Sequence, residues 1–427
     1  MFWSYEDVDR LHIELTNVCN AACPTCVRFY RNSPLLRPDL TLGQITLEKF
    51  KNYFPAEIIK KCKIIFFCGV HGDPVSARDL YEICQYIAAT SDCTSIGINT
   101  NGGIRSSDWW KKIGLLFASQ TSLNWYITFS VDGLEDTNHL YRRNVVWKDL
   151  IRNIESFIGA GGVAKWDYLI FKHNEHQVQE ALELSKKMGF REFIPKKAMG
   201  VDNGHSLISL PVLNEKGSVD YWIEAPVQPE NRSLENPSAE EYRPTASFNP
   251  QQYQRLKKNK KIEDANYFER SANFYRDRFK HVEEGERKSE EASCQIRCKS
   301  QVGSSKEIFI DNFGRVFPCC YVGLQLNSIF DEEATLQLHH HMEEYGWDKF
   351  DLNKYSLETI LKEGHLDRLY ADTWSLPSTL DGRLKHCADT CGKASGIDKI
   401  FTHQLSTKRP QEGTDSLSSP EVQNKTE

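Results

Sequence analysis

Three cysteines near the start of the chain, Cys19, Cys23 and Cys26, constrain this protein more than any other feature. Their spacing is C-x3-C-x2-C, and they follow residues 11–15, which alternate apolar and polar side chains like a strand. Soft thiolates prefer iron–sulfur clusters, so three of them in so short a run can hold three corners of a [4Fe–4S] cube. The fourth iron then stays open to a substrate or cofactor, as in catalytic metal sites that keep one position free. A structural zinc site and unrelated core cysteines are the alternatives, but zinc usually takes four ligands and no nearby fourth partner is evident.

A strand followed by this cysteine spacing resembles the start of a radical S-adenosylmethionine (radical SAM) enzyme. The resemblance implies that Cys19, Cys23 and Cys26 hold a catalytic [4Fe–4S] cluster whose open iron chelates the amino and carboxylate groups of SAM. It also implies reductive cleavage of SAM to a 5′-deoxyadenosyl radical that abstracts hydrogen from a substrate, with an electron donor such as flavodoxin or ferredoxin. In the family an aromatic residue commonly precedes the last cysteine and stacks on adenine. Here that position is Thr25, and Phe29 or Tyr30 could serve nearby.

Composition indicates an ordinary globular protein that is long enough for two domains. The chain has 427 residues, about 40% of them hydrophobic, and a formal net charge of −6, which argues against general binding to nucleic-acid phosphates. It contains neither an apolar run of about 18 residues nor a secretory segment, so we expect a cytoplasmic protein without a membrane span. Thirteen cysteines, an odd number, argue against a disulfide scaffold and favour metal binding by the clustered ones. The scattered cysteines are interpreted as small buried hydrophobes: Cys62, Cys68, Cys84 and Cys93.

Strand-like and helix-like segments alternate over the first two hundred residues. Strands are expected at 10–16, 63–68, 94–99, 125–131, 165–171 and 192–195. Helices are expected near 46–53, 76–90, 107–117, 147–160 and 174–188. Such alternation predicts an α/β fold, either an open parallel barrel or a doubly wound sheet. The radical SAM resemblance implies a partial (β/α)6 barrel, and active sites in such folds lie at the carboxyl ends of the strands.

Loops that follow three of these strands also match the family. Residues 69–74 resemble the Gly-Gly-Glu-Pro motif whose backbone binds the SAM amino group, with His71 at the first glycine and Asp73 at the glutamate. Residues 99–102 resemble a Thr-Asn-Gly loop, and residues 130–133 with Arg142 resemble a Ser-x-Asp-Gly…Arg signature. A serine and a guanidinium can hold the SAM carboxylate, with Arg143 an adjacent rival for Arg142. The SAM-binding residues that the resemblance implies are Gly72, Asp73, Asn99, Ser130, Asp132 and Arg142.

A second set of cysteines lies beyond a polar and charged stretch, residues 201–293. That stretch is interpreted as an insertion or linker, in which 226–250 is an extended loop and the basic, aromatic-containing run that follows is a solvated helix face rather than a nucleic-acid site. Residues 307–318 predict a β-hairpin, and 355–370 predict a helix. The cysteines that surround these elements are Cys294, Cys298, Cys319, Cys320, Cys387 and Cys391.

The hairpin and its cysteines resemble the SPASM and twitch auxiliary-cluster domains. The resemblance implies that a second [4Fe–4S] cluster is held by Cys298, Cys319, Cys387 and Cys391. Four matched cysteines favour a small α+β twitch-like domain; Cys294 and Cys320 are spare, and either could replace an assigned ligand. A zinc site on the same four cysteines is the alternative. The expected organisation is therefore a barrel at 1–200, the insertion at 201–293, the twitch-like domain at 294–403 and a disordered tail at 404–427.

The expected function is that of a two-cluster radical SAM enzyme. Because SPASM and twitch relatives often modify ribosomally made peptides, a peptide is the favoured substrate. Only 18 residues precede Cys19, so a separate leader-binding partner would be needed. A small molecule or nucleotide is the second interpretation. A non-catalytic iron–sulfur or zinc protein that senses or scaffolds remains as a third, from a different class.

Overall fold

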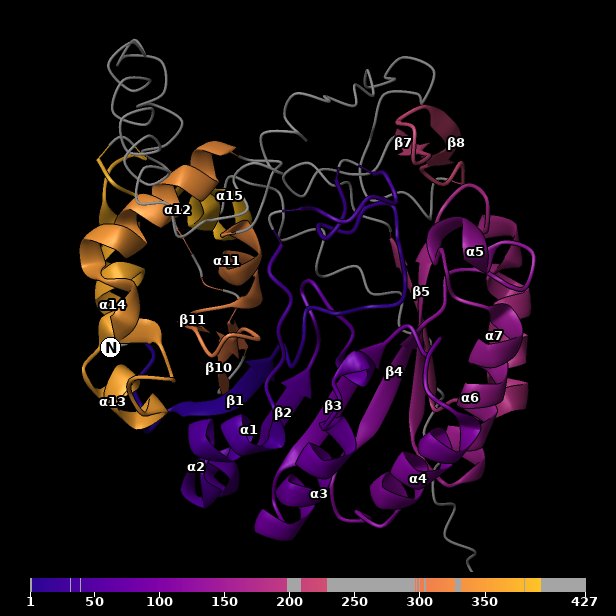
Figure 1. The fold of residues 1–427 in the computed structure, drawn as a ribbon, viewed down its shortest axis with the longest axis horizontal. Coiled ribbons are helices and arrows are strands. Elements are labelled where there is room, and N and C mark those ends of the chain that lie inside the picture. The colour runs from indigo at the N-terminus through magenta and orange to yellow at the C-terminus, as the bar shows by residue number, and fades with distance from the viewer. Residues whose placement is uncertain are drawn as a thin grey trace, which may run out of the picture.

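The computed structural model describes most of the chain in ten segments: residues 2–30, 32–38, 40–197, 209–228, 296, 298, 300–302, 305–326, 332–379 and 381–392 (Figure 1). Four sequence predictions fall wholly or largely outside these residues: the extended loop at 226–250, the charged helix at 251–291, the role of Cys294 and the disordered tail at 404–427. None of the described helices is long and apolar enough to cross a membrane.

Six parallel strands form the body of the molecule in their order along the chain. They are β1 (Val8–Ile13), β2 (Ile64–Phe67), β3 (Ser95–Thr100), β4 (Tyr126–Ser130), β5 (Ala164–Ile170) and β6 (Glu192–Lys197). Neighbours in sequence are neighbours in the sheet, and the order from β1 to β6 never reverses among the described strands. A doubly wound sheet needs such a reversal, so the α/β fold is the open, partial barrel. All six strand predictions are confirmed, with ends displaced by a few residues at most.

The connecting helices cover the outer face of this sheet. They are α1 (Leu47–Tyr53), α2 (Ala56–Lys61), α3 (Leu80–Thr90), α4 (Ser107–Ala118), α5 (Asn138–Tyr141), α6 (Trp147–Gly159) and α7 (Val178–Met188), with 3-10 turns η1 (Pro74–Ser76) and η2 (Glu175–Gln177). Figure 1 shows these helices along one side of the strands. Phe129 on β4, for example, packs against Trp110 of α4 and Phe157 of α6, with ring centroids 5.3 and 5.9 Å apart. Burying each such aromatic side chain contributes roughly 1.5–3 kcal/mol.

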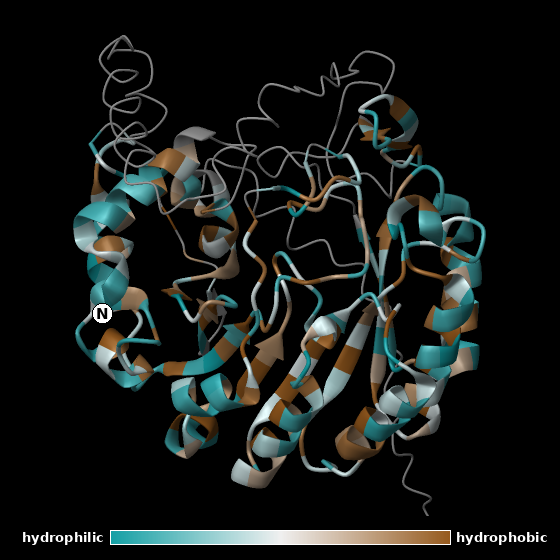
Figure 2. Cartoon of the chain, in the orientation of Figure 1, coloured by the Kyte–Doolittle hydropathy of each residue, from teal (hydrophilic) through white to brown (hydrophobic). Residues whose placement is uncertain are grey.

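The concave face of the same sheet carries charged side chains, and the strands contain both hydrophobic residues and more polar ones, drawn in brown and in white or teal in Figure 2. Lys165 on β5 pairs with Glu192 on β6 at 3.0 Å and lies over the ring of Tyr126 on β4. At the β1 end of the six strands, Arg10 pairs with Glu307 at 3.4 Å. Because successive side chains of a strand point to opposite faces, one set of strands has both an apolar helix-facing side and a polar interior.

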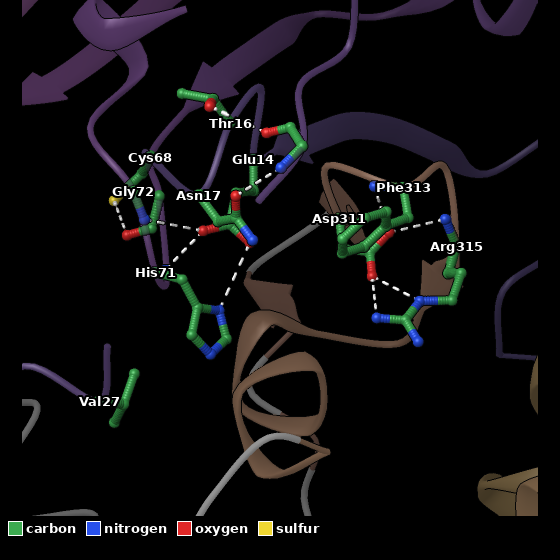
Figure 3. Close-up of polar contacts among 12 residues, drawn as sticks. Glu14, Thr16, Asn17, Val27, Cys68, His71, Gly72, Asp311, Phe313 and Arg315 are labelled. Atoms are coloured by element: carbon green, nitrogen blue, oxygen red, sulfur yellow. Dashed lines mark hydrogen bonds and ion pairs between the residues drawn. The ribbon is translucent and has the colours of Figure 1, made fainter. Parts of the chain in front are cut away.

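The carboxyl-terminal hairpin extends the barrel sheet. Its strands are β10 (Ser305–Ile310) and β11 (Val316–Phe317), with the short strand β9 (Gln301–Val302) beside β10. The hairpin prediction is confirmed, and β10 pairs in parallel with β1, so that Ile13 lies opposite Ile310. Asp311 closes the turn by accepting hydrogen bonds from the backbone N–H groups of Phe313 and Arg315 (Figure 3). Gly314 has a φ of +88°, a left-handed conformation that favours glycine.

Short helices complete the region after the hairpin. They are α11 (Cys320–Gln325), α12 (Glu332–Tyr345), α13 (Leu357–Lys362), α14 (His365–Leu369) and α15 (Lys385–Cys391), with 3-10 turns η4 (Trp347–Phe350) and η5 (Ala371–Ser375). The helix predicted at 355–370 forms, but as two helices, because Gly364 between them has a φ of +69°. A second hairpin, β7 (Ser209–Leu213) and β8 (Val219–Glu224), lies inside the stretch that sequence analysis interpreted as an insertion.

Candidate functional site

The three-cysteine loop leaves the carboxyl end of β1 and is tied down at its base. Asn17 donates from Nδ2 to the Thr41 carbonyl at 2.7 Å and accepts at Oδ1 from the Gly43 N–H at 2.9 Å. Within the loop, the buried Arg28 donates from Nη1 to the carbonyl of Cys19 at 3.1 Å. Sequence analysis missed both Asn17 and Arg28, because neither belongs to a recognisable motif. These contacts fix the path of the backbone that carries the thiols.

The sulfur atoms of this loop receive hydrogen bonds from other loops of the barrel. Cys19 Sγ accepts from the Ala21 N–H at 3.3 Å and from Asn101 Nδ2 at 3.5 Å. Cys23 Sγ accepts from Arg142 Nη1 at 3.7 Å. Burial raises the pKa of the Cys26 thiol to about 11, and it raises the pKa of Cys19 and Cys23 as well. Donors aimed at sulfur suit thiolates that ligate iron, since such hydrogen bonds tune iron–sulfur clusters.

The loop after β2 packs against the base of the cysteine loop (Figure 3). The buried Glu14 accepts hydrogen bonds from the backbone N–H groups of His71, at 2.5 Å, and Gly72, at 3.1 Å. A Cβ atom on Gly72 would lie 1.9 Å from the Thr16 carbonyl oxygen, and one on Gly69 would lie 1.8 Å from the carbonyl oxygen of Gly72. Both positions therefore need glycine, because backbone passes directly against backbone.

Asp73, which stands where the family motif has glutamate, joins two loops of the barrel. Its carboxylate accepts from the N–H groups of Val75, at 2.9 Å, and Asn101, at 2.8 Å. It also accepts from the Thr100 hydroxyl at 2.9 Å and from Asn101 Nδ2 at 2.7 Å. Burial raises the pKa of this carboxyl, and the hydrogen bonds oppose that rise. Asp73 is thus held in place by protein donors from the ends of β2 and β3.

The two asparagines of residues 99–102 occupy different places. Asn99 is half-buried within β3, opposite Thr128 of β4. Asn101 lies just beyond the strand, and its side-chain amide contacts Cys19, Asn20 and Asp73. The asparagine that reaches the cysteine loop is therefore Asn101, which the Thr-Asn-Gly resemblance contained but the expected SAM contacts did not include.

The loop after β4 brings Asp132 and Arg142 together beside Cys23. Asp132 is fully buried, and its Oδ2 accepts from Arg142 Nε at 2.5 Å. Its other oxygen accepts from the Leu169 N–H at 2.6 Å. Ser130, at the end of β4, is half-buried and lies opposite Asp167 of β5. Of the two rival arginines, Arg142 thus contacts both an expected site carboxylate and a cysteine of the triad.

The position before Cys26 makes a polar contact instead of offering an aromatic ring. Thr25 Oγ1 lies 2.5 Å from the Tyr141 hydroxyl, and Tyr141 packs on Phe171 with ring centroids 4.6 Å apart. Phe29 and Tyr30, the two nearby aromatic candidates, are buried in the core. The aromatic pair beside the cysteine loop is therefore Tyr141 and Phe171, which are distant from it in sequence.

Four cysteines of the second set line a cavity of about 300 Å³, a volume that includes the solvent at its mouth. Cys387 and Cys391 stand one turn apart on α15, while Cys319 immediately precedes α11. Burial raises the pKa of Cys319, Cys387 and Cys298. The side chains that line the cavity include Cys298, Cys319, Cys387, Cys391, Tyr321 and Trp374.

Cys320, the first residue of α11, is not among the residues that line this cavity. Among the described residues, no three His, Cys, Asp or Glu side chains converge closely enough to hold a single metal ion.

No protein-family model matches the chain, and no curated protein matches it. SuiB from Streptococcus suis bound to S-adenosylmethionine is 12% identical, with a TM-score of 0.41, over 74% of this chain and 60% of SuiB. Native anSMEcpe with bound S-adenosylmethionine is 12% identical, with a TM-score of 0.46, over 92% of this chain and 95% of that protein. SuiB bound to its precursor peptide SuiA matches with a TM-score of 0.41. This chain therefore spans about three fifths of the length of SuiB.

Proposed function

We propose that this protein is a radical SAM enzyme with a catalytic [4Fe–4S] cluster on Cys19, Cys23 and Cys26. The observation that carries the proposal is the convergence of three motif-like loops on the cysteine loop. Asn101 after β3 reaches Cys19, Arg142 after β4 reaches Cys23, and the glycine loop after β2 packs against the backbone that precedes Cys19. Unrelated core cysteines would have no reason to collect these three contacts at the carboxyl ends of parallel strands.

When bound, the cluster would supply the electron that cleaves SAM to a 5′-deoxyadenosyl radical, delivered by a donor such as flavodoxin or ferredoxin. The residues of the chain itself would bind SAM and orient it. Asp73 and Asn101 lock the loops of β2 and β3 together, so that the backbone around Gly72 is a rigid surface for the SAM amino group. Arg142, oriented by Asp132, would bind the SAM carboxylate, and Asn99 and Ser130 would supply polar side chains at the ends of β3 and β4.

We also propose an auxiliary [4Fe–4S] cluster on Cys298, Cys319, Cys387 and Cys391. The support is that all four line one cavity, although nearly one hundred residues separate the first from the last. Cys320, which does not line the cavity, is left out of the proposed ligand set. A ribosomally made peptide is the proposed substrate class, on the resemblance of this hairpin and its cysteines to auxiliary-cluster domains, with a separate leader-binding protein as partner.

Iron content and SAM cleavage test these assignments together. After anaerobic reconstitution we expect about eight irons per chain, falling to about four in the Cys19/Cys23/Cys26→Ala variant and to about four in the Cys387/Cys391→Ala variant. Reduced wild-type protein should convert SAM to 5′-deoxyadenosine, and only the first variant should abolish that product. The matched control is Cys84→Ala, a buried free cysteine in α3 outside both sets. Iron without SAM cleavage would favour the non-catalytic alternative, and zinc in place of the second four irons would overturn the auxiliary cluster.

A further inference from the structure

The β7–β8 hairpin covers one side of the cysteine loop. Its apolar face packs on the Tyr141–Phe171 pair, and Cys23 borders the resulting cluster. Val212 and Ile223 have no exposed surface, whereas Val219 on the same hairpin is 44% exposed. The buried residues of this cluster are Leu210, Val212, Ile223, Tyr141 and Phe171. Figure 1 shows the hairpin above α5, at the end of the barrel to which the strands point.

A series of hydrogen bonds, one of them from the Arg143 side chain, connects the cysteine loop to this hairpin. The Leu213 N–H donates to the Asn32 carbonyl at 3.1 Å, and the Leu213 carbonyl accepts from Arg143 Nη1 at 3.4 Å. The Arg143 carbonyl in turn accepts from the Ala22 N–H at 2.9 Å. Ala22 lies inside the loop, directly before Cys23, and Asn32 lies in the segment that follows Cys26, so Leu213 and Arg143 link the middle of the cysteine loop to the chain beyond it.

The hairpin is itself anchored to the barrel by its second strand. Tyr221 Oη donates to the Leu140 carbonyl of α5 at 2.6 Å. The Lys172 N–H, just after β5, donates to the Glu224 carbonyl at 3.0 Å, and the two side chains pair at 2.9 Å. The hairpin therefore belongs to the rigid frame of the site.

We propose that the β7–β8 hairpin, with Arg143 as a positioning residue, shields the Cys23 corner of the catalytic site from water and from water-borne reagents. An apolar shell around a metal site controls solvent access and the local dielectric, and with them the redox potential. The inference extends the proposed function, because it gives a role to a segment and to an arginine outside the motif contacts. It also explains the rival arginines: Arg142 contacts Cys23 itself, and Arg143 holds the cover.

Thiol alkylation of the iron-free protein tests the shield without relying on a cluster. Iodoacetamide forms a bond from its methylene carbon to Cys23 Sγ, iodide leaves, and the thiol proton goes to the buffer; mass spectrometry gives the rate for each cysteine. We expect Val212→Ser to speed labelling of Cys23 several-fold and Val219→Ser, the exposed control on the same hairpin, to leave it unchanged. Cys93, which is exposed, should react alike in all variants. Equal Cys23 rates in wild type and Val212→Ser would overturn the shield.

Arg143 variants keep the test decisive if Val212→Ser unfolds, which labelling of the buried Cys84 would reveal. Arg143→Ala should speed Cys23 labelling, and Arg143→Lys, whose ammonium can still donate to the Leu213 carbonyl, should restore most of the protection. Equal rates for the alanine and lysine variants would contradict the positioning role.

Iron loss under argon provides the matching test in the loaded protein. Ethylenediaminetetraacetate should remove iron several-fold faster from Val212→Ser and Arg143→Ala than from wild type, followed by cluster absorbance. A wild-type protein that takes up no iron would overturn the proposed function, while the alkylation rates would still decide the shield.

Discussion

Removal of the Arg142 side chain should destabilise the fold by far more than loss of a surface ion pair. Asp132 is fully buried, and only 17% of the Arg142 side chain is exposed. Burial raises the pKa of Asp132, and the Arg142 charge opposes that rise. Without the guanidinium, the carboxylate keeps the Leu169 N–H at 2.6 Å, but in the described part of the chain it has no second ion-pair partner. Breaking a buried pair in this way costs about 3–5 kcal/mol, whereas exposed pairs contribute about 0–1 kcal/mol.

The assay is urea denaturation of the iron-free protein, followed by tryptophan fluorescence. Arg142→Met should lower the free energy of unfolding by about 3 kcal/mol at neutral pH. The control is Arg152→Met, because Arg152 pairs with Asp149 at 2.8 Å with both side chains more than 40% exposed; it should cost less than about 1 kcal/mol. The double variant Asp132→Asn/Arg142→Met should lose much less than the sum of its single variants, since no uncompensated charge remains.

The pH dependence supplies an independent check. Burial already raises the pKa of Asp132 in the wild-type protein, and loss of the opposing Arg142 charge should raise that pKa further, so folded Arg142→Met should bind a proton at a higher pH than folded wild type. The loss of stability in Arg142→Met relative to wild type should therefore be largest at neutral pH and should shrink as the pH falls. A cost for Arg142→Met no larger than that of Arg152→Met, or additive single costs in the double variant, would refute the reasoning.

Three further outcomes are expected. Gly72→Ala should abolish soluble folded protein, because its Cβ would lie 1.9 Å from the Thr16 carbonyl oxygen, whereas Gly159→Ala, whose Cβ has no described atom within 4 Å, should fold normally by circular dichroism. Burial lowers the pKa of His173 to about 4, so the unfolded chain binds more protons between about pH 6.5 and 4. The free energy of unfolding should therefore decrease as the pH is lowered through that window, and His173→Asn should flatten the slope in urea titrations; an unchanged slope would be evidence against a neutral buried imidazole. Asp311→Ala should cost about 2–3 kcal/mol in the same assay, because the turn between β10 and β11 loses its acceptor; a cost near zero would contradict that role.

Much of the barrel could be predicted from the sequence, because the residue patterns that specify its strands and helices are local. Residues 63–68 and 125–130 are near-continuous apolar runs, and they form β2 and β4 as central parallel strands covered by helices. Helix starts were less predictable. Asp73 caps a 3-10 turn at Pro74–Ser76, so α3 begins at Leu80 rather than near residue 76. A capping contact of this kind depends on local geometry that periodicity does not contain.

The site was only partly predictable, because its contacts cross the barrel. The glycine loop and the Ser-x-Asp-Gly loop were predicted from their residues. The sequence did not show, however, which of two neighbouring residues in a motif contacts the site. Asn99 lies within β3, whereas Asn101 lies just beyond it. Arg142 and Arg143 both follow the short helix α5, but their side chains contact different partners. The β7–β8 hairpin escaped prediction because its short apolar strands gain their burial from Tyr141 and residues near it, far away in the chain.

The sequence by itself determined the order of strands and helices, the three-cysteine loop and the four later cysteines, since spacing, periodicity and residue type are local properties of the chain. Only the tertiary structure decided which side chains meet. It joined β10 to β1 across almost three hundred residues, gathered Cys298, Cys319, Cys387 and Cys391 around one cavity, and set the hairpin over Cys23. Such contacts follow from packing the whole chain, in which burial of apolar surface offsets the entropy of bringing distant segments together.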